Sequence, residues 1–211
     1  MMKVELEKMI EQKSEKEIRM MAVNFRAVED ESNKMVIEGY AVVFDSPATH
    51  FDLTEIIDKN AFNGCDMKDV PLKYNHDDSH LILARTRNNS LNLLIDDKGL
   101  KVRAELIDTQ SNIDIYKSIK AGLLDKMSFA FTVSEADWDI SSEPAVRTIK
   151  KIDKLYDVSV VDTPFYDATS IYARALDTLE SEKKKLESLK EQKRELERQK
   201  LATILKIYGG K

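Results

Sequence analysis

Strand-length segments dominate the middle of this chain. Between residues 21 and 161, most apolar side chains either alternate with polar ones or occur in short runs rich in β-branched residues, as in partly or fully buried strands. We predict strands at residues 22–28, 34–44, 70–74, 81–86, 90–95, 100–106, 126–133, 145–152 and 155–161. Residues 96–99, Asp-Asp-Lys-Gly, have the composition of a hairpin loop. The chain is therefore expected to fold around a mainly β core.

A single helical pattern interrupts the strands. Apolar residues from Ile113 to Ile119 recur at helical spacing, and Gly122 follows where a helix would end, so we predict a helix at residues 112–121. The acidic segment 135–144 has the composition of a surface loop.

The C-terminal segment has a different pattern. From Leu176 onward neither Pro nor Gly occurs before Gly209, which indicates a long helix. Leucines in this segment recur at heptad-compatible spacing: Leu179, Leu186, Leu189 and Leu196. Lys193 and Lys200 stand at core positions and weaken the seam. We predict a C-terminal coiled-coil helix over residues 176–211, with a solvated helix folded back on its own domain as the alternative.

These patterns divide the chain into three parts. Residues 1–20 are rich in Glu and Lys with few apolar positions, and we predict a charged N-terminal helical segment there. Residues 21–175 form the β domain, and residues 176–211 form the coiled-coil helix. The predicted fold class is mainly β with flanking helices, an α+β arrangement.

The charge balance argues against a nucleic-acid ligand. Residues 21–176 carry 18 Lys and Arg residues against 26 Asp and Glu residues. Binding to a phosphate backbone depends on clustered basic side chains that release counterions. We therefore expect no nucleic-acid partner.

Cysteine content and hydropathy bound the compartment. Cys65 is the only cysteine, so the chain can form neither an internal disulfide nor a cysteine-based zinc site. No apolar run approaches the roughly 18 residues that span a bilayer, and the first residues lack the apolar run of an export signal. We expect an intracellular protein that is neither secreted nor inserted in a membrane.

One of three histidines is a candidate general base. His76 directly follows a predicted strand, whereas His50 and His80 fall in predicted loops. The alternative is that His76 only caps a strand end and bonds a neighbouring carboxylate such as Asp77 or Asp78.

Ser128 is a candidate nucleophile because of its place in a strand. Strand alternation puts Met127, Phe129, Phe131 and Val133 on one face. The opposite face carries the small residues Ser128, Ala130 and Thr132. Small side chains leave space beside the hydroxyl for an extended peptide, and a histidine could activate it. The alternative is that Ser128 lies on the solvated side of an ordinary half-buried strand.

Asp157 is the candidate third member of such a site. It interrupts a predicted strand of strong β-formers, where a carboxylate is unfavourable unless it is paired. Asp153 and Asp162 lie at the ends of the same strand and are explained as end residues. A carboxylate bonded to a catalytic histidine would hold the ring in the correct tautomer.

Five segments in order resemble the prohead, or capsid-maturation, serine proteases of tailed double-stranded DNA phages, distant relatives of the herpesvirus assemblins. The resemblance covers residues 24–175. The segments are residues 37–44 (IEGYAVVF), 57–62 (IDKNAF), 75–77 (NHD), 127–131 (MSFAF) and 157–161 (DVSVV), the last followed by Pro164.

The resemblance implies a fold and a site. The expected fold is a closed, mostly antiparallel β-barrel of the assemblin and prohead protease type, flanked by helices. His76 would be the general base, Ser128 the nucleophile and Asp157 the orienting acid, a position often held by Glu in the family. No metal or cofactor is required. We expect the turn at residues 163–166 to supply oxyanion donors.

The resemblance also implies a function. Such a protease cleaves scaffold or capsid-protein extensions, and often itself, inside the assembling procapsid in the host cytoplasm. The C-terminal coiled coil would then bind a helical scaffold or mediate self-association. One alternative is a non-catalytic scaffold or assembly protein that binds capsid partners through its terminal helices; another is a hydrolase acting on small esters.

Overall fold

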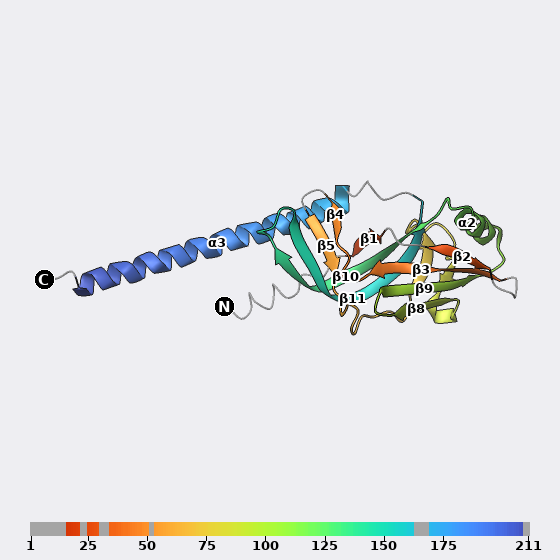
Figure 1. The fold of residues 1–211 in the computed structure, drawn as a ribbon, viewed down its shortest axis with the longest axis horizontal. Helices are drawn as coiled ribbons and strands as arrows, with labels where there is room; N and C mark the ends of the chain where they lie inside the picture. The colour runs from red at the N-terminus through yellow and green to blue at the C-terminus, as the bar shows by residue number, and fades with distance from the viewer. Residues whose placement is uncertain (1–15, 22–24, 30–33, 51–52, 163–168, 209–211) are drawn as a thin grey trace. The chain divides into compact units, whose positions relative to one another are not determined.

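The computed structural model describes residues 16–21, 25–29, 34–50, 53–162 and 169–208 of the 211-residue chain. The chain divides into two compact units, residues 1–166 and 167–211 (Figure 1). The first contains every described strand, and the second contains a single long helix.

The elements of the first unit follow one another in this order: β1 (Glu17–Met21), β2 (Arg26–Glu29), β3 (Met35–Val43), β4 (Ala48–His50), β5 (Leu53–Ile57), β6 (Pro71–Tyr74), β7 (Ala84–Arg85), the 3₁₀ turn η1 (Thr86–Asn88), β8 (Leu91–Ile95), β9 (Gly99–Leu106), α2 (Gln110–Lys120), β10 (Lys126–Asp139) and β11 (Ala145–Val161). This order confirms the mainly β prediction.

The strands form two sheets. The four-stranded sheet has the order β2-β3-β9-β8 and is antiparallel throughout. The seven-stranded sheet has the order β1-β10-β11-β5-β4, and β6 and β7 extend it beside β11. β11 is antiparallel to β10 but parallel to β5 over its first residues and to β6 over its last.

The prediction of a closed antiparallel barrel is wrong. The pairings among the described strands give two separate sheets, and two pairings of the larger sheet are parallel. Both parallel pairings involve β11, a strand of 17 residues whose two ends pair with different neighbours along the same edge. Alternation in a sequence reports which face a residue occupies, not which strand lies beside it.

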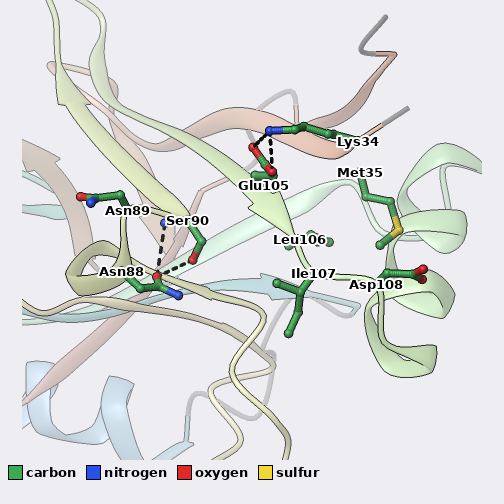
Figure 2. Close-up of a pocket in the computed structure, with 9 residues that line it drawn as sticks. All are labelled: Lys34, Met35, Asn88, Asn89, Ser90, Glu105, Leu106, Ile107 and Asp108. Atoms are coloured by element: carbon green, nitrogen blue, oxygen red, sulfur yellow. Dashed lines mark hydrogen bonds and ion pairs between the residues drawn. The ribbon is translucent and has the colours of Figure 1, made fainter. Parts of the chain in front are cut away.

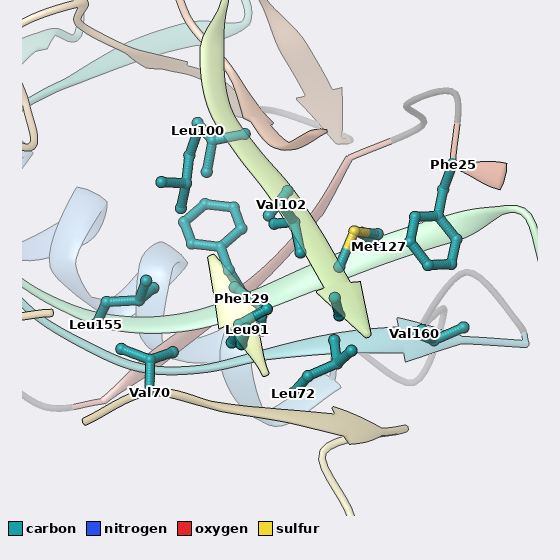
Figure 3. Close-up of a cluster of buried hydrophobic side chains, with 14 of the residues drawn as sticks. Phe25, Val70, Leu72, Leu91, Leu100, Val102, Met127, Phe129, Leu155 and Val160 are labelled. Atoms are coloured by element: carbon teal, nitrogen blue, oxygen red, sulfur yellow. The ribbon is translucent and has the colours of Figure 1, made fainter. Parts of the chain in front are cut away.

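Both sheets contribute to one hydrophobic core. Figure 3 shows side chains from β9, β10 and β11 in the same cluster, among them Leu100, Phe129 and Leu155. The rings of Phe129 and Phe131 stack with centroids 4.7 Å apart. Each such side chain contributes about 1.5–3 kcal/mol by burial, so the apolar face of β10 is a major part of the core.

The predicted hairpin at residues 96–99 is confirmed between β8 and β9. The Asp96 carboxylate accepts hydrogen bonds from the backbone N–H groups of Lys98 and Gly99. A Cβ at Gly99 would lie 1.9 Å from the carbonyl oxygen of Val42, so only glycine allows β3 and β9 to approach this closely.

Several local predictions need correction. The segment predicted as a strand at 81–86 forms only the two residues of β7 and the start of η1. The predicted loop 135–144 is shorter, because β10 continues to Asp139. The strands predicted at 145–152 and 155–161 are one strand, β11. The predicted helix at 112–121 is confirmed as α2, and the Thr109 side chain caps it by accepting the N–H of Asn112.

The charged N-terminal segment is partly a strand. Residues 1–15 lie outside the described residues, but Glu17–Met21 form β1, which pairs antiparallel with β10. The prediction of a helical segment over 1–20 is therefore wrong for its last residues. Their charged side chains find partners inside the sheet, as described below.

The second unit is the helix α3 (Thr169–Tyr208), which begins seven residues before the predicted start. Leu186, Leu189 and Leu196 are exposed on it. Pairing of α3 into a coiled coil remains a prediction. Among the described residues, no helix contains an apolar stretch of the length that a bilayer span requires.

Candidate active site

The candidate residues come together where β10, β11 and the end of β6 meet. Ser159 of β11 pairs with Ser128 of β10 on one side and with Lys73 of β6 on the other. The chain leaves β6 at Tyr74, so His76 emerges beside the same part of β11. One strand therefore holds the histidine segment and the serine strand in register.

The backbone turn after β6 directs His76 toward the serine strand. Asn75 and His76 both have left-handed φ angles, of 51° and 55°. Such angles are uncommon outside glycine and require support from the surroundings. Here the N–H of Asn75 donates to the carbonyl of Val160 at 2.9 Å, and the Asn75 side chain accepts the N–H of Asp162 at 3.2 Å.

His76 connects the serine to the acid. Its Nε2 lies 2.6 Å from the hydroxyl oxygen of Ser128, and its Nδ1 is hydrogen-bonded to the Asp157 carboxylate. Asp157 and Ser128 are 0% and 2% exposed, and the His76 side chain is 12% exposed. A nucleophile, a base and an orienting acid joined in this order form the constellation that activates a serine hydroxyl.

A β-bulge places Asp157 on the face of the serine. Ala130 pairs with Asp157 and Phe131 pairs with Leu155, so Tyr156 is left as the extra residue of β11. Without the bulge, Asp157 would share the core-facing side of Leu155, because residues two apart in a strand lie on one face. The bulge moves the carboxylate to the face that carries Ser128.

A second hydroxyl, Ser159, supports His76 and was not predicted from the sequence. Its Oγ lies 3.1 Å from His76 Nδ1 and 3.2 Å from the Asp157 carboxylate, and it accepts the backbone N–H of His76 at 3.2 Å. Ser159 is fully buried. The sequence shows that Ser159 stands two residues after Asp157. That it also pairs with Ser128, and so lies beside His76, follows only from the strand register.

The site holds Asp157 in its charged form. Burial by itself raises the pKa of this carboxyl group, but the hydrogen bond and electrostatic interaction with His76, together with the positive charge of Lys16, outweigh that effect, and the net pKa is lowered. Lys16 Nζ lies 3.1 Å from the Asp157 carboxylate, and Lys73 Nζ lies 3.9 Å away. An ionised Asp157 accepts Nδ1–H and leaves Nε2 of the ring free to accept the serine proton.

A protein-family model described as caudovirus prohead serine protease matches residues 21–184. The chain belongs to this family. A structural comparison finds the bacteriophage T4 capsid assembly protease gp21, which is 11% identical, with a TM-score of 0.45 over 69% of this chain and 98% of that one. The comparison with curated proteins finds no match.

The other candidate residues of this prohead protease lie elsewhere. His80 bonds Asp77 at 2.8 Å, and Asp78 bonds Lys73, so neither acid pairs with the His76 ring. Asp162 accepts the Tyr74 hydroxyl at 2.8 Å. His50 ends β4, at the far edge of the seven-stranded sheet from β10.

The solvated-face alternative for Ser128 is excluded. Ser128, Ala130 and Thr132 are 2%, 0% and 3% exposed, so the small-residue face of β10 is buried like the core face. The serine hydroxyl is thus a buried group with a hydrogen-bond partner in His76, which an ordinary amphipathic strand does not provide.

Oxyanion donors, a metal site and a cysteine nucleophile have less support in this prohead protease than the serine site. The turn at 163–166, predicted to supply oxyanion donors, lies outside the described residues. Among the residues that the structure describes, no group of three or more His, Cys, Asp and Glu could hold a metal ion. Burial raises the pKa of the Cys65 thiol to about 11, so it is protonated at neutral pH and a poor nucleophile.

A surface pocket of about 680 Å³ lies away from the three residues (Figure 2). The Lys34–Glu105 ion pair, 2.8 Å long, lies in its wall. Its lining residues are Lys34, Met35, Asn88, Asn89, Ser90, Glu105, Leu106, Ile107 and Asp108. His76, Ser128 and Asp157 do not line this pocket, and we place the candidate site at these hydrogen-bonded residues rather than in the pocket.

Proposed function

We propose that this family member is a serine endopeptidase with Ser128 as nucleophile, His76 as general base and Asp157 as orienting acid. The observation that carries the proposal is the 2.6 Å contact between Ser128 Oγ and His76 Nε2, made while Nδ1 of the same ring is bonded to Asp157. Both nitrogens of the ring are thus engaged as a general base requires.

The proposed reaction proceeds through an acyl-enzyme. Ser128 Oγ attacks the carbonyl carbon of a peptide bond as its proton moves to His76 Nε2, and the Asp157 carboxylate stabilises the imidazolium that forms. His76 then returns the proton to the leaving amine, and the C–N bond breaks. A water molecule attacks the acyl-enzyme while His76 takes its proton, and the Ser128 hydroxyl is restored. Ser159 keeps the ring oriented through these steps.

We further infer the biological substrate from the family. Prohead proteases are named for the immature phage shell, which supports scaffold or capsid-protein extensions as substrates, and the protease itself as another, inside the procapsid in the host cytoplasm. The helix α3 would recruit the protease to a helical scaffold or pair two copies, since Leu189 and Leu196 expose apolar surface at coiled-coil spacing.

The substitution Ser128→Ala tests the enzymatic proposal. It should lower the rate of cleavage of a co-expressed capsid protein about 10⁵- to 10⁶-fold, because it removes the nucleophile. The matched control is Ser134→Ala on the same strand, since Ser134 is exposed and its hydroxyl donates to the Lys151 carbonyl at 3.4 Å. Mass spectrometry of the capsid protein gives the readout.

The same experiment separates the enzyme from a non-catalytic scaffold. The exposed leucines of α3 favour the scaffold alternative, in which Ser128→Ala would leave capsid processing unchanged. A protein that retains wild-type cleavage with alanine at position 128 would remove Ser128 from the mechanism.

A further inference from the structure

The chain's own β1 lies beside the candidate nucleophile. β1 pairs antiparallel with β10, with Met20 opposite Ser128 and Arg19 opposite Phe129. The edge of β10 next to the serine, opposite the side that pairs with β11, is therefore occupied by residues 17–21. An exposed strand edge at this place would bind an extended peptide through main-chain hydrogen bonds.

The backbone of β1 contacts the serine hydroxyl directly. Ser128 Oγ lies 2.9 Å from the carbonyl oxygen of Arg19, to which it can only donate. A serine has one hydroxyl hydrogen, so this carbonyl competes with His76 Nε2 for it. A scissile carbonyl would instead direct its oxygen at oxyanion donors and its carbon at the nucleophile. The Arg19 carbonyl is thus bound at the site in an arrangement unsuited to attack.

The same segment contacts the acid of the site. Lys16, which directly precedes β1, forms an ion pair with Asp157 at 3.1 Å, and its ammonium group lies 5.4 Å from the centre of the Tyr156 ring. Residues 16–19 therefore touch both ends of the Ser128–His76–Asp157 chain of hydrogen bonds.

An ion cluster fixes β1 from the other face of the sheet. Arg19 bonds Glu55 of β5, and Glu17 bonds Arg147 of β11 at 2.7 Å. Arg147 and Glu55 also bond each other at 2.9 Å. Because these two buried residues are partners of one another, departure of β1 would leave neither of them as an unpaired charge. The cluster holds β1 in place and still permits its release.

We propose that residues 16–21 are an internal inhibitory strand that occupies the binding site of an extended peptide substrate on β10. The inference rests on the proposed role of Ser128 as nucleophile. Ser128 is only 2% exposed, and β1 occupies the edge of β10 beside it, so an extended peptide can pair with that edge only after this strand leaves. The substrate then adds to β10 as an antiparallel strand in its place, and the Ser128 hydrogen returns to His76.

A reversible disulfide between β1 and β10 tests the proposal in the full chain. Ile18 and Ala130 are directly opposite in the antiparallel pair, at a separation that suits a disulfide. Ile18→Cys and Ala130→Cys are combined with Cys65→Ser, which removes the native thiol. The readout is the rate at which a fluorophosphonate probe labels Ser128, measured by mass spectrometry. Labelling should be about tenfold slower or more in the oxidised protein than in the same protein after reduction.

The control disulfide lies in the other sheet. Asn92→Cys and Arg103→Cys, also with Cys65→Ser, join directly opposite residues of β8 and β9. The labelling rate of this protein should be the same before and after reduction.

A second variant loosens the strand and does not depend on forming a disulfide. Lys16→Ala with Glu17→Gln removes one contact to Asp157 and weakens one to Arg147, and labelling should become about twofold to fivefold faster. Lys154→Ala is the matched control, because Lys154 contacts the same Tyr156 ring at 5.3 Å and forms its ion pair with Asp66. It should leave the labelling rate unchanged.

The outcomes separate the two proposals. Equal labelling of the oxidised and reduced β1–β10 protein, with no acceleration in the loosened variant, overturns the inhibitory strand and leaves the protease proposal intact. Absence of Ser128 labelling in every variant, including the loosened one, rejects the nucleophile and the inhibitory strand with it.

Discussion

Strands β9 and β10 have the same alternating pattern but different second faces. In β9 the residues between the apolar ones, Lys101, Arg103 and Glu105, are exposed or half-buried, as expected of a sheet with one solvated face. In β10 the corresponding residues Ser128, Ala130 and Thr132 are buried. The comparison shows that alternation alone does not separate a solvated face from a candidate site; residue size and the segments packed on that face do.

The largest expected effect tests the contact that most distinguishes β10, the bond from Ser128 to His76. His76→Ala removes the base and should reduce cleavage of a peptide substrate about 10⁵- to 10⁶-fold in kcat. His80→Ala is the control, because His80 is exposed and its ring bonds Asp77 rather than Asp157. Similar losses of kcat in both variants would mean that activity depends on the segment after β6 that carries both histidines, and not on the His76 ring itself.

A smaller loss is expected at the acid. Asp157→Asn preserves the size of the side chain but favours the wrong tautomer of His76, and kcat should fall about 10⁴-fold. Asp153→Asn, on the exposed side of the same strand, should retain wild-type kcat. Wild-type activity in Asp157→Asn would exclude the carboxylate as the orienting group.

The two second faces should also differ in how they tolerate a large apolar side chain. Ala130→Leu adds volume to a fully buried position and should lower the free energy of unfolding by about 1–3 kcal/mol. Arg103→Leu, on the exposed face of β9, should change it by no more than about 0.5 kcal/mol. Urea denaturation measures the free energy of unfolding of both variants. Equal changes would mean that the second face of β10 accommodates a large side chain as readily as the exposed face of β9.

The smallest expected effect concerns pH. The pKa of Asp157 is lowered in the folded protein, so its ionised form contributes stability above the unfolded pKa of about 3.9, and that contribution is lost as pH falls through the folded pKa. The difference in free energy of unfolding between wild type and Asp157→Asn should shrink as the pH falls below about 4. A difference that grows on acidification would contradict the lowered pKa.

Much of the fold could be predicted from local patterns. Alternation located β3, β6, β8, β9 and the first half of β10, and helical spacing located α2, because these signals depend on residues near one another in the chain. The charged residues of β1 gave no such signal. Glu17 and Arg19 resemble the surface of a helix, but they pair with Arg147 and Glu55, more than thirty residues away in each case.

The sequence by itself determined the membership of the prohead serine protease family and the candidates His76, Ser128 and Asp157, because these depend on residue identity and order. Only the tertiary structure decided how they meet. The bulge at Tyr156 turns Asp157 away from the core face, the left-handed turn aims His76, and β1 covers Ser128. Each depends on pairing or contacts with another strand, and local alternation carries no information about such contacts.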